Sequence, residues 1–292
     1  MIGTVQNVSA LPPLPPRPAD GHKGTFGRVL VVAGSRGMTG AAVLTGSAAV
    51  RGGAGLVTVA CPAAVQDVVS VGNPCYLTAG LLPGGQPNDY ADQATALAEK
   101  ADVLAVGPGL GQHPEVRNLV RQLLLRTPNT PTVLDADALN LLPPIPDAIR
   151  TRSAPLVLTP HPGEFARLLN TSTEQVQANR LNLAVGFAAG WHAVLLLKGH
   201  RTIVTDGAQV YVNDTGNPGM ATGGSGDVLT GLLAALIGQG MSGFDAAVLG
   251  AWVHGRAGDH AAEAVGQTAL CAVDVLTHLP SALREVERNS WR

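Results

Sequence analysis

The sequence predicts an α/β sandwich with an open, mostly parallel central sheet and helices on both faces. Three observations lead to this prediction. Short apolar runs recur without the period-two alternation of half-exposed strands, which is typical of strands covered on both faces of a parallel sheet. Segments with helical spacing of apolar residues lie between these runs. Finally, one Asp-Gly pair separates two β-rich arms.

Five apolar runs are the candidate strands of the parallel part of the sheet. In chain order they are RVLVVAG (28–34), ADVLAVGPG (101–109), PTVLDAD (131–137), APLVLTPHPG (154–163) and HAVLLLKG (192–199). Each run ends in Gly, Asp, His or Lys near its carboxyl end rather than in ordinary polar residues. Ligands of open α/β sheets bind at the carboxyl ends of strands, so these end residues are the first candidates for a functional site.

Two further segments carry clear local signals. Thr171 and Glu174 have capping-box spacing in TSTEQVQANRLNLAVGFAA, and apolar positions follow at helical spacing, which predicts one helix. In RTIVTDGAQVYVN, the pair Asp206 and Gly207 separates the two β-rich arms. This pattern predicts an antiparallel hairpin at the edge of the sheet.

The totals limit the classes of function. We expect a Pro-rich arm over residues 1–20 and a single domain over residues 21–292 of this 292-residue chain. A formal net charge of -2 and an aromatic content of 3% argue against nucleic acid and anionic membrane surfaces as partners. Cys61, Cys75 and Cys271 show no metal-binding spacing. With no signal peptide and no apolar run of about 20 residues, the expected location is the cytoplasm.

The stretch NPGMATGGSGDVLTG (217–231) predicts a phosphate site. Gly223, Gly224 and Gly226 allow a tight loop, and the leucines after Asp227 predict a helix whose first backbone N–H groups are free. Such a turn forms an anion hole. Asp227 is then either an N-cap or a base that accepts the proton of an attacking hydroxyl. The density of glycine favours the second interpretation, because a cap requires only one Asp.

Other strand ends supply further candidates, each with a structural alternative. Lys198 can reach a phosphate or support a loop, or it can be an ordinary surface lysine with a packed stem. Thr202, in KGHRT, is a candidate polar contact to a nucleotide. His161 and Glu164, in TPHPGEF, form either part of a site or a capped, Pro-braced turn.

Two remaining groups give weaker signals. Asp135 and Asp137 are two residues apart and would point to opposite faces if the strand continued that far, so we do not expect an acid-base pair, although either is a candidate for a magnesium-bound water. His254 and Asp259 lie in a helical, Ala- and Gly-rich segment and are expected to serve packing. GSRGMTGAA (34–42) lacks the spacing of a dinucleotide fingerprint, which argues against a dehydrogenase.

The motifs HKGTFGRVLVVAGS, GMTGAA, GPGLG, LDADALN, TPHPGE, KG and NPGMATGGSGDVLTG, in this order, resemble the ADP- or ATP-dependent NAD(P)H-hydrate dehydratases. These ribokinase-like enzymes repair hydrated nicotinamide cofactors. The resemblance runs from about Gly21 to the last helices and implies a ribokinase-like three-layer sandwich. In many bacteria the dehydratase is fused behind an epimerase domain, and we expect the stand-alone form here because the chain is too short for that fusion.

The resemblance also implies a reaction. ADP or ATP, with Mg²⁺, would phosphorylate the C6 hydroxyl of the S-form of hydrated NADH or NADPH, and elimination of phosphate would restore NAD(P)H. Asp227 would be the catalytic base, and Ala41, Gly109, His161 and Asp227 would contact the hydrate. The residues that would bind the adenine nucleotide are Lys198, Gly199, His200, Arg201, Thr202, Gly224, Ser225 and Gly226. The ligands of the magnesium ion stay open among Glu164, Asp135 and Asp137, and the family likeness favours ADP and a homotetramer.

Two departures from the superfamily pattern and two alternatives accompany this interpretation. His161-Pro162-Gly163-Glu164 replaces the N-x-x-E string of many sugar kinases, and Ser225 stands where Thr is at least as frequent. A small-molecule kinase of the same fold, similar to hydroxymethylpyrimidine or thiazole kinases, would use the same anion hole and base. A non-catalytic adenine-nucleotide sensor is the second alternative, against which the presence of Asp227 argues.

Overall fold

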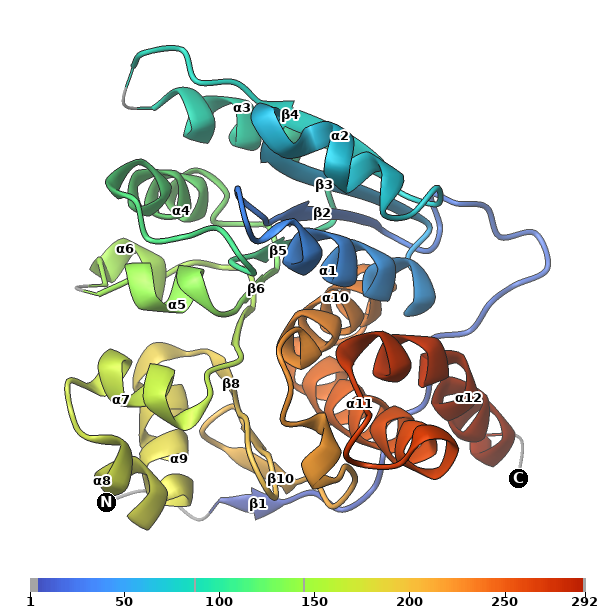
Figure 1. The fold of residues 1–292 in the computed structure, drawn as a ribbon. Coiled ribbons are helices and arrows are strands. Elements are labelled where there is room, and N and C mark those ends of the chain that lie inside the picture. The colour runs from blue at the N-terminus through green and yellow to red at the C-terminus, as the bar shows by residue number, and fades with distance from the viewer. Residues whose placement is uncertain (1–4, 87, 144, 291–292) are drawn as a thin grey trace.

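The central element of the fold is a ten-stranded sheet (Figure 1). The computed structural model describes residues 5–86, 88–143 and 145–290. The strand order is β1-β10-β9-β8-β7-β6-β5-β2-β3-β4. Neighbouring strands pair in parallel except on both sides of β9, where they are antiparallel. The predicted mostly parallel sheet is therefore confirmed.

All five apolar runs form strands. They are β2 (Arg28–Val32), β5 (Val103–Val106), β6 (Thr132–Leu134), β7 (Leu156–Leu158) and β8 (Val194–Leu197). Two strands at one edge, β3 (Leu56–Pro62) and β4 (Leu77–Leu81), belong to the parallel part of the sheet although no apolar run predicted them.

Helices cover both faces of the sheet and enclose one apolar core on each (Figure 1). The helices on the first face are α1 (Thr39–Arg51), α2 (Gln66–Val71), α10 (Ser225–Gly238), α11 (Gly243–Val265) and α12 (Ala272–Ser290). The helices on the second face are α3 (Asp89–Ala98), α4 (Pro114–Arg126), α5 (Asp137–Leu141), α6 (Asp147–Arg150), α7 (Pro162–Leu169), α8 (Thr173–Ala178) and α9 (Arg180–Trp191). Along β2, Val31 enters the first core and Leu30 the second, as expected for a strand covered on both faces.

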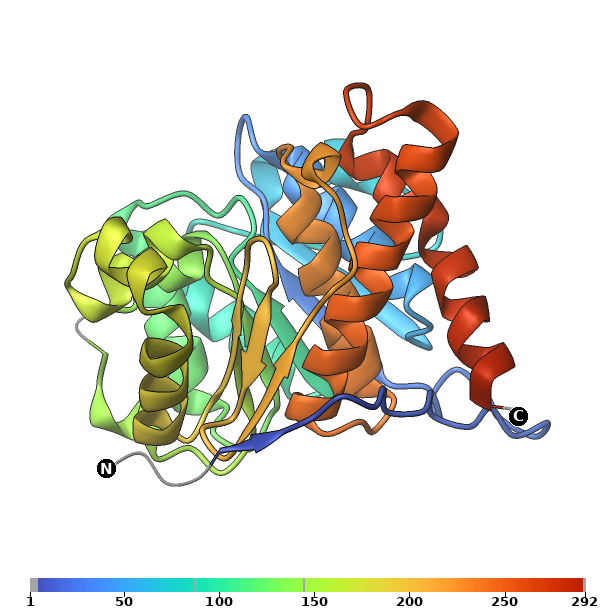
Figure 2. The ribbon, with the colours of Figure 1, turned by 90° about the horizontal axis from the view of Figure 1, so that it is seen from below.

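The predicted hairpin is present, and the Pro-rich arm extends the sheet beyond it. β9 (Ile203–Thr205) and β10 (Gln209–Val212) pair in antiparallel fashion around the predicted Asp-Gly turn. β1 (Gln6–Asn7), which belongs to the arm, then pairs in parallel with β10 (Figure 2). Further along the arm, apolar side chains including Leu11 pack against the first core. The arm therefore lies against the body of the protein over much of its length.

The single helix predicted after Thr171 is wrong in its start and in its continuity. The N-cap is Ser172, whose hydroxyl accepts a hydrogen bond from Gln175 N at 3.3 Å. The helix then breaks at Asn179, where φ is -140°, so α8 and α9 are separate helices. Helical spacing of apolar residues continues across the break, because both helices bury a face in the same core.

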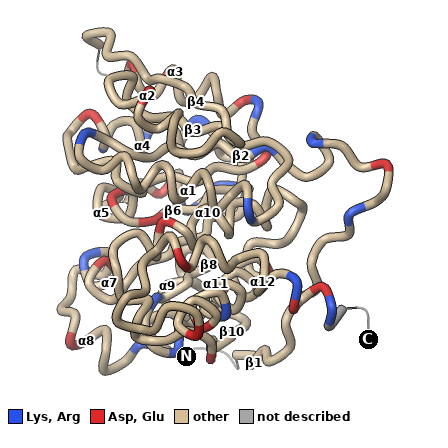
Figure 3. Tube along the Cα trace, turned by 45° about the vertical axis from the view of Figure 1, so that its right-hand side comes forward, with Lys and Arg blue, Asp and Glu red and all other residues tan. Residues whose placement is uncertain are grey.

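Charged side chains are few and of mixed sign along the chain (Figure 3). Figure 3 shows Lys and Arg residues interspersed with Asp and Glu residues along the tube. None of the helices in the described ranges combines the length and the apolar composition that a membrane span requires.

Candidate active site

Helix α10 begins on a glycine turn and not on Asp227. Its N-cap is Gly224, with φ 91° and ψ -14°, and no side chain caps the first turn. Gly is required there because an L side chain is strained at this φ, and a Cβ atom would also lie 2.5 Å from Leu44 Cδ1. Asp227 is the third helical residue, so the N-cap interpretation of Asp227 is wrong. The first-turn N–H groups are left without a side-chain cap, as an anion hole requires.

The environment of Asp227 suits a base that works near neutral pH. Burial raises the pKa of Asp227 to about 6, with a further increase from Asp135 that Lys198 opposes. Above that pH the carboxylate is ionised and can accept a proton, while its affinity for the proton exceeds that of an ordinary Asp.

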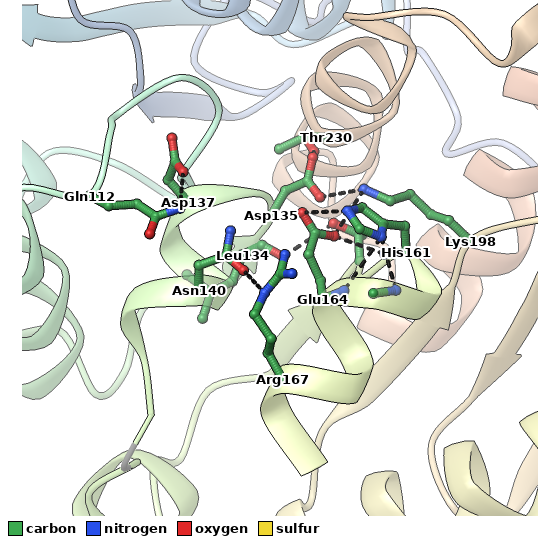
Figure 4. Close-up of polar contacts among 12 residues, drawn as sticks. Gln112, Leu134, Asp135, Asp137, Asn140, His161, Glu164, Arg167, Lys198 and Thr230 are labelled. Atoms are coloured by element: carbon green, nitrogen blue, oxygen red, sulfur yellow. Dashed lines mark hydrogen bonds and ion pairs between the residues drawn. The ribbon is translucent and has the colours of Figure 1, made fainter. Parts of the chain in front are cut away.

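Lys198, at the end of β8, binds buried carboxylates. Its Nζ atom lies 2.7 Å from Asp135 Oδ1 and 3.8 Å from Glu164 Oε2 (Figure 4). Burial alone would lower the pKa of Lys198, but the charges of Asp135 and Glu164 outweigh burial and raise it. The interpretation of Lys198 as an ordinary surface lysine is therefore wrong, and the site holds a permanently charged cation.

Asp135 connects this lysine to the start of α10. Its side chain is 1% exposed, and Oδ2 accepts a hydrogen bond from Thr230 Oγ1 at 2.8 Å. Gly226 lies directly over the ion pair, since a Cβ atom added there would be 3.2 Å from Lys198 Nζ and 3.4 Å from Asp135 Oδ2. The glycine at this position thus lets the backbone of the first turn approach the cation.

Asp137 belongs to a different part of the site. The strand β6 ends at Leu134, so the premise of two carboxylates on opposite faces of one strand is wrong. Ala136, with φ 50° and ψ -120°, turns the chain between them, and Asp137 opens α5. In Figure 4 it points toward Gln112, and its Oδ2 accepts a hydrogen bond from Gly111 N at 2.8 Å. Asp137 therefore holds the loop after β5.

His161 and Glu164 form a capping box at the start of α7. His161 Nδ1 accepts hydrogen bonds from Gly163 N at 3.1 Å and Glu164 N at 3.4 Å, and Glu164 Oε2 accepts one from His161 N at 2.8 Å. Burial lowers the pKa of His161, although Glu164 opposes this effect. The ring is therefore neutral with its proton on Nε2, which lies 3.4 Å from Glu164 Oε1. The capped-turn interpretation is confirmed, and Nε2–H is the one donor that the ring can offer to a ligand.

A cavity of about 980 Å³ adjoins this cluster. Seven of the eight expected nucleotide-binding residues line it, namely Lys198, Gly199, His200, Arg201, Thr202, Ser225 and Gly226. The eighth, Gly224, is the N-cap next to them. His161, an expected substrate contact, also lines the cavity. The volume is at the upper end of the range for small-molecule sites and leaves room for a nucleotide.

Several residues in or behind the cavity wall were not predicted as site residues from the sequence. The loop 213–218, after β10, forms one wall, and Asp259 fixes it by accepting a hydrogen bond from Gly216 N at 3.0 Å. His254, on α11, donates from Nε2 to the Ser225 carbonyl oxygen at 2.9 Å. Burial lowers the pKa of His254 to about 4, which keeps the ring neutral. Both side chains therefore do more than the packing expected of them, and only their contacts in space reveal this.

The structure also brings Ala41 and Gly109 together. A Cβ atom at Gly109 would lie 2.8 Å from Ala41 Cβ, and Ser35 Oγ donates to the Gly109 carbonyl oxygen at 2.8 Å. Ala41 follows β2 and Gly109 follows β5, next to β6, β7 and β8 in the strand order. Ala41, Gly109, His161 and Lys198 consequently form a row along the carboxyl ends of parallel strands. The expected residues 224–227 come instead from the start of α10.

The carboxylates of the site fit a magnesium ion that arrives with a nucleotide. No group of three His, Cys, Asp or Glu residues with metal-site geometry occurs in the part of the chain that the structure describes. Asp135 and Glu164 already bind Lys198 and hydrogen-bond donors. Mg²⁺ commonly binds one or two carboxylates together with phosphates and several waters, so a site of this kind needs no protein cage.

Comparisons with known proteins identify the family of the chain. A family model described as NAD(P)H-hydrate dehydratase matches residues 29–280. The chain is 50% identical over 279 residues to the bifunctional NAD(P)H-hydrate repair enzyme Nnr of Moorella thermoacetica, covering 94% of this chain and 52% of that protein. It is 43% identical over 258 residues to the ADP-dependent (S)-NAD(P)H-hydrate dehydratase of Neisseria meningitidis serogroup B, covering 86% and 82%. The chain thus spans about half the length of the bifunctional relatives.

Solved structures show the same fold. The ADP/ATP-dependent NAD(P)H-hydrate dehydratase from Bacillus subtilis, co-crystallized with ATP/Mg²⁺, superposes with a TM-score of 0.83 at 31% identity, covering 94% of this chain and 95% of that one. A ribokinase-like superfamily protein from Enterococcus faecalis V583 superposes with a TM-score of 0.82 at 26% identity, covering 97% and 96%. The expected ribokinase-like fold is therefore confirmed.

Proposed function

The chain belongs to the NAD(P)H-hydrate dehydratase family, and on this premise we propose that it uses ADP or ATP to dehydrate the S-form of hydrated NADH or NADPH. One observation carries the proposal: Asp227 lies in the uncapped first turn of α10, next to a cavity that Lys198 lines. This arrangement places a base, a cation and free N–H groups around one position for a phosphoryl group.

The first step is phosphoryl transfer. Asp227 accepts the proton of the C6 hydroxyl while the hydroxyl oxygen attacks the terminal phosphoryl group of the nucleotide. The bond from that phosphorus atom to the bridging oxygen breaks, so AMP leaves from ADP, or ADP leaves from ATP. The N–H groups of the first turn and the Lys198 ammonium group stabilise the negative charge that is transferred. The raised pKa of Asp227, about 6, increases its affinity for this proton and still leaves it ionised at neutral pH.

The second step is elimination. The lone pair of the ring nitrogen expels phosphate from C6, and loss of a proton from C5 restores the double bond of the dihydronicotinamide. Ala41, Gly109 and His161 bind the hydrate in this proposal. The Nε2–H group of His161 is the hydrogen-bond donor available to it, because Nδ1 caps α7.

Magnesium, when bound, neutralises charge on the phosphates of the nucleotide. We infer that the phosphates and water molecules would hold it and that Glu164 would reach it through water, because both oxygens of Asp135 already have partners. The family likeness favours ADP over ATP and a homotetramer over a monomer. Light scattering of the purified chain tests the assembly.

A direct assay tests the function. The purified protein is incubated with hydrated NADH, Mg²⁺ and either ADP or ATP, and the absorbance of reduced nicotinamide is followed. We expect the absorbance to return with at least one nucleotide. Failure to recover, combined with phosphorylation of a hydroxymethylpyrimidine or a thiazole alcohol, would favour the kinase alternative. Nucleotide binding without any turnover would favour the sensor alternative.

A further inference from the structure

Asp135 is buried between two parts of the site that are far apart in the sequence. It follows β6, whereas Lys198 follows β8 and Thr230 belongs to α10. We propose that Asp135 is a positioning residue that fixes the Lys198 ammonium group and the first turn of α10 in one shared geometry. The inference rests on the proposed function, because it assigns a task to Asp135 within that site.

The contacts of Asp135 divide cleanly between its two oxygens. Oδ1 binds Lys198 Nζ at 2.7 Å, and Oδ2 accepts the Thr230 hydroxyl proton at 2.8 Å (Figure 4). Hydrogen bonds to charged groups are short and roughly twice as strong as neutral ones. The two contacts therefore define the distance between the cation at the end of β8 and the helix that carries the free N–H groups.

Thr230 transmits this constraint to the first turn. Its Oγ1 atom also lies 3.1 Å from the Gly226 carbonyl oxygen, one turn earlier in α10. Gly226 in turn lies against both Lys198 and Asp135, since a Cβ atom added at Gly226 would be within 3.4 Å of each side chain. A shift of Asp135 would thus move Lys198 and the backbone around Gly226 relative to each other.

The surroundings indicate that Asp135 acts through Lys198 and not on the reacting atoms. Both of its oxygens have partners, and its side chain is 1% exposed. Glu164 is a weaker partner of Lys198 than Asp135 is, because its Oε2 atom is 3.8 Å from Lys198 Nζ. The next residue, Ala136, adopts the uncommon φ of 50°, a strain that accompanies the turn between Asp135 and Asp137.

The test measures ADP binding to the full chain by calorimetry in the presence of Mg²⁺, with adenosine as the probe that lacks phosphates. Asp135→Asn should weaken ADP binding about tenfold or more, the scale of one lost hydrogen bond to a charged group, and leave adenosine binding unchanged. Thr230→Val should weaken ADP binding about threefold to tenfold, and Thr230→Ser should restore it. Thr127→Val is the matched control, because the Thr127 hydroxyl binds only the Leu123 carbonyl oxygen of α4.

Kinetics then separate positioning from general destabilisation. Both site variants should raise the KM for the nucleotide and lower kcat, while Thr127→Val changes neither. If Asp135→Asn fails to fold, Thr230→Val decides, since it replaces only the hydroxyl with a methyl group of similar size. Wild-type-like ADP affinity and kcat in a folded Asp135→Asn or Thr230→Val protein would overturn the inference. A further outcome is that the wild type restores no NADH while Asp135→Asn still weakens the binding of ADP and not that of adenosine. That result would support the positioning role of Asp135 and contradict only the proposed reaction.

Discussion

Helices α7 and α10 both begin beside Lys198, but they treat their first-turn N–H groups in opposite ways. In α7, the His161 ring accepts hydrogen bonds from Gly163 N and Glu164 N, so the helix caps itself. In α10, the N-cap is Gly224 and no side chain caps the turn. A capped turn has no free donors for an anion, whereas an uncapped one does. Glycine at a helix start can therefore mark a ligand site, whereas a polar cap can mark a structural one.

The largest effect should come from the carboxylate of the uncapped turn. Asp227→Asn should lower kcat by roughly 10²-fold or more while nucleotide binding survives, because only the base is lost. Asp67→Asn is the matched control, since Asp67 also lies in a first turn, that of α2. Steady-state kinetics and calorimetry measure both quantities. Undiminished kcat in Asp227→Asn would show that another group accepts the proton.

The pH dependence should follow the same carboxylate. Its pKa of about 6 is raised by burial and then by Asp135, so kcat/KM should fall about tenfold per pH unit well below pH 6. Because the folded-state pKa lies above the ordinary 3.8, protonation favours the folded state, and that contribution is lost as the pH rises through 6. Asp227→Asn should therefore be more stable than the wild type above pH 6, with the gain vanishing near pH 4. Thermal unfolding measures this difference across the pH range. Equal stability of the two proteins at every pH would contradict the assignment.

Crowding the uncapped turn should have a moderate effect. Gly224→Ala must adopt φ 91° and meets Leu44, so we expect about 1–2 kcal/mol of lost stability from the backbone and about tenfold weaker ADP binding. Gly240→Ala is the control, because Gly240 has φ 97° but nothing within 4 Å of an added Cβ atom. Unfolding and calorimetry compare the two. Equal ADP affinity in both variants would argue against a phosphate at this turn.

Substitution of the N-cap of α7 should have the smallest effect. His161→Ala removes the cap and should cost about 1 kcal/mol of stability, whereas His161→Asn keeps a good N-cap side chain and should cost less. Both variants lose Nε2–H, so both should raise the KM for the hydrate. Chemical denaturation and kinetics separate these two roles. A normal KM in His161→Asn would restrict His161 to capping.

The sequence carried the signals of the fold and of the nucleotide segments, because these depend on local pattern. The buried run around Val31, the turn at Asp206 and the glycines before Asp227 all correspond to observed elements or turns. Strands β3 and β4 and the break at Asn179 gave no such signal. Asp135 contacts Lys198 and Thr230, which are 63 and 95 residues away in the sequence, so only the folded structure reveals these contacts. The loop 213–218 likewise becomes a cavity wall only after the sheet has formed.

In the proposed reaction, the uncapped start of α10 holds the phosphoryl group, and Asp227 deprotonates the hydroxyl that attacks it. A crystal structure of the protein with ADP and Mg²⁺ tests this arrangement most directly. We expect phosphate oxygens within hydrogen-bond distance of the N–H groups of residues 225–227, with Lys198 beside them. Phosphates bound away from this turn and out of reach of Asp227 would show that the turn is not the phosphoryl site.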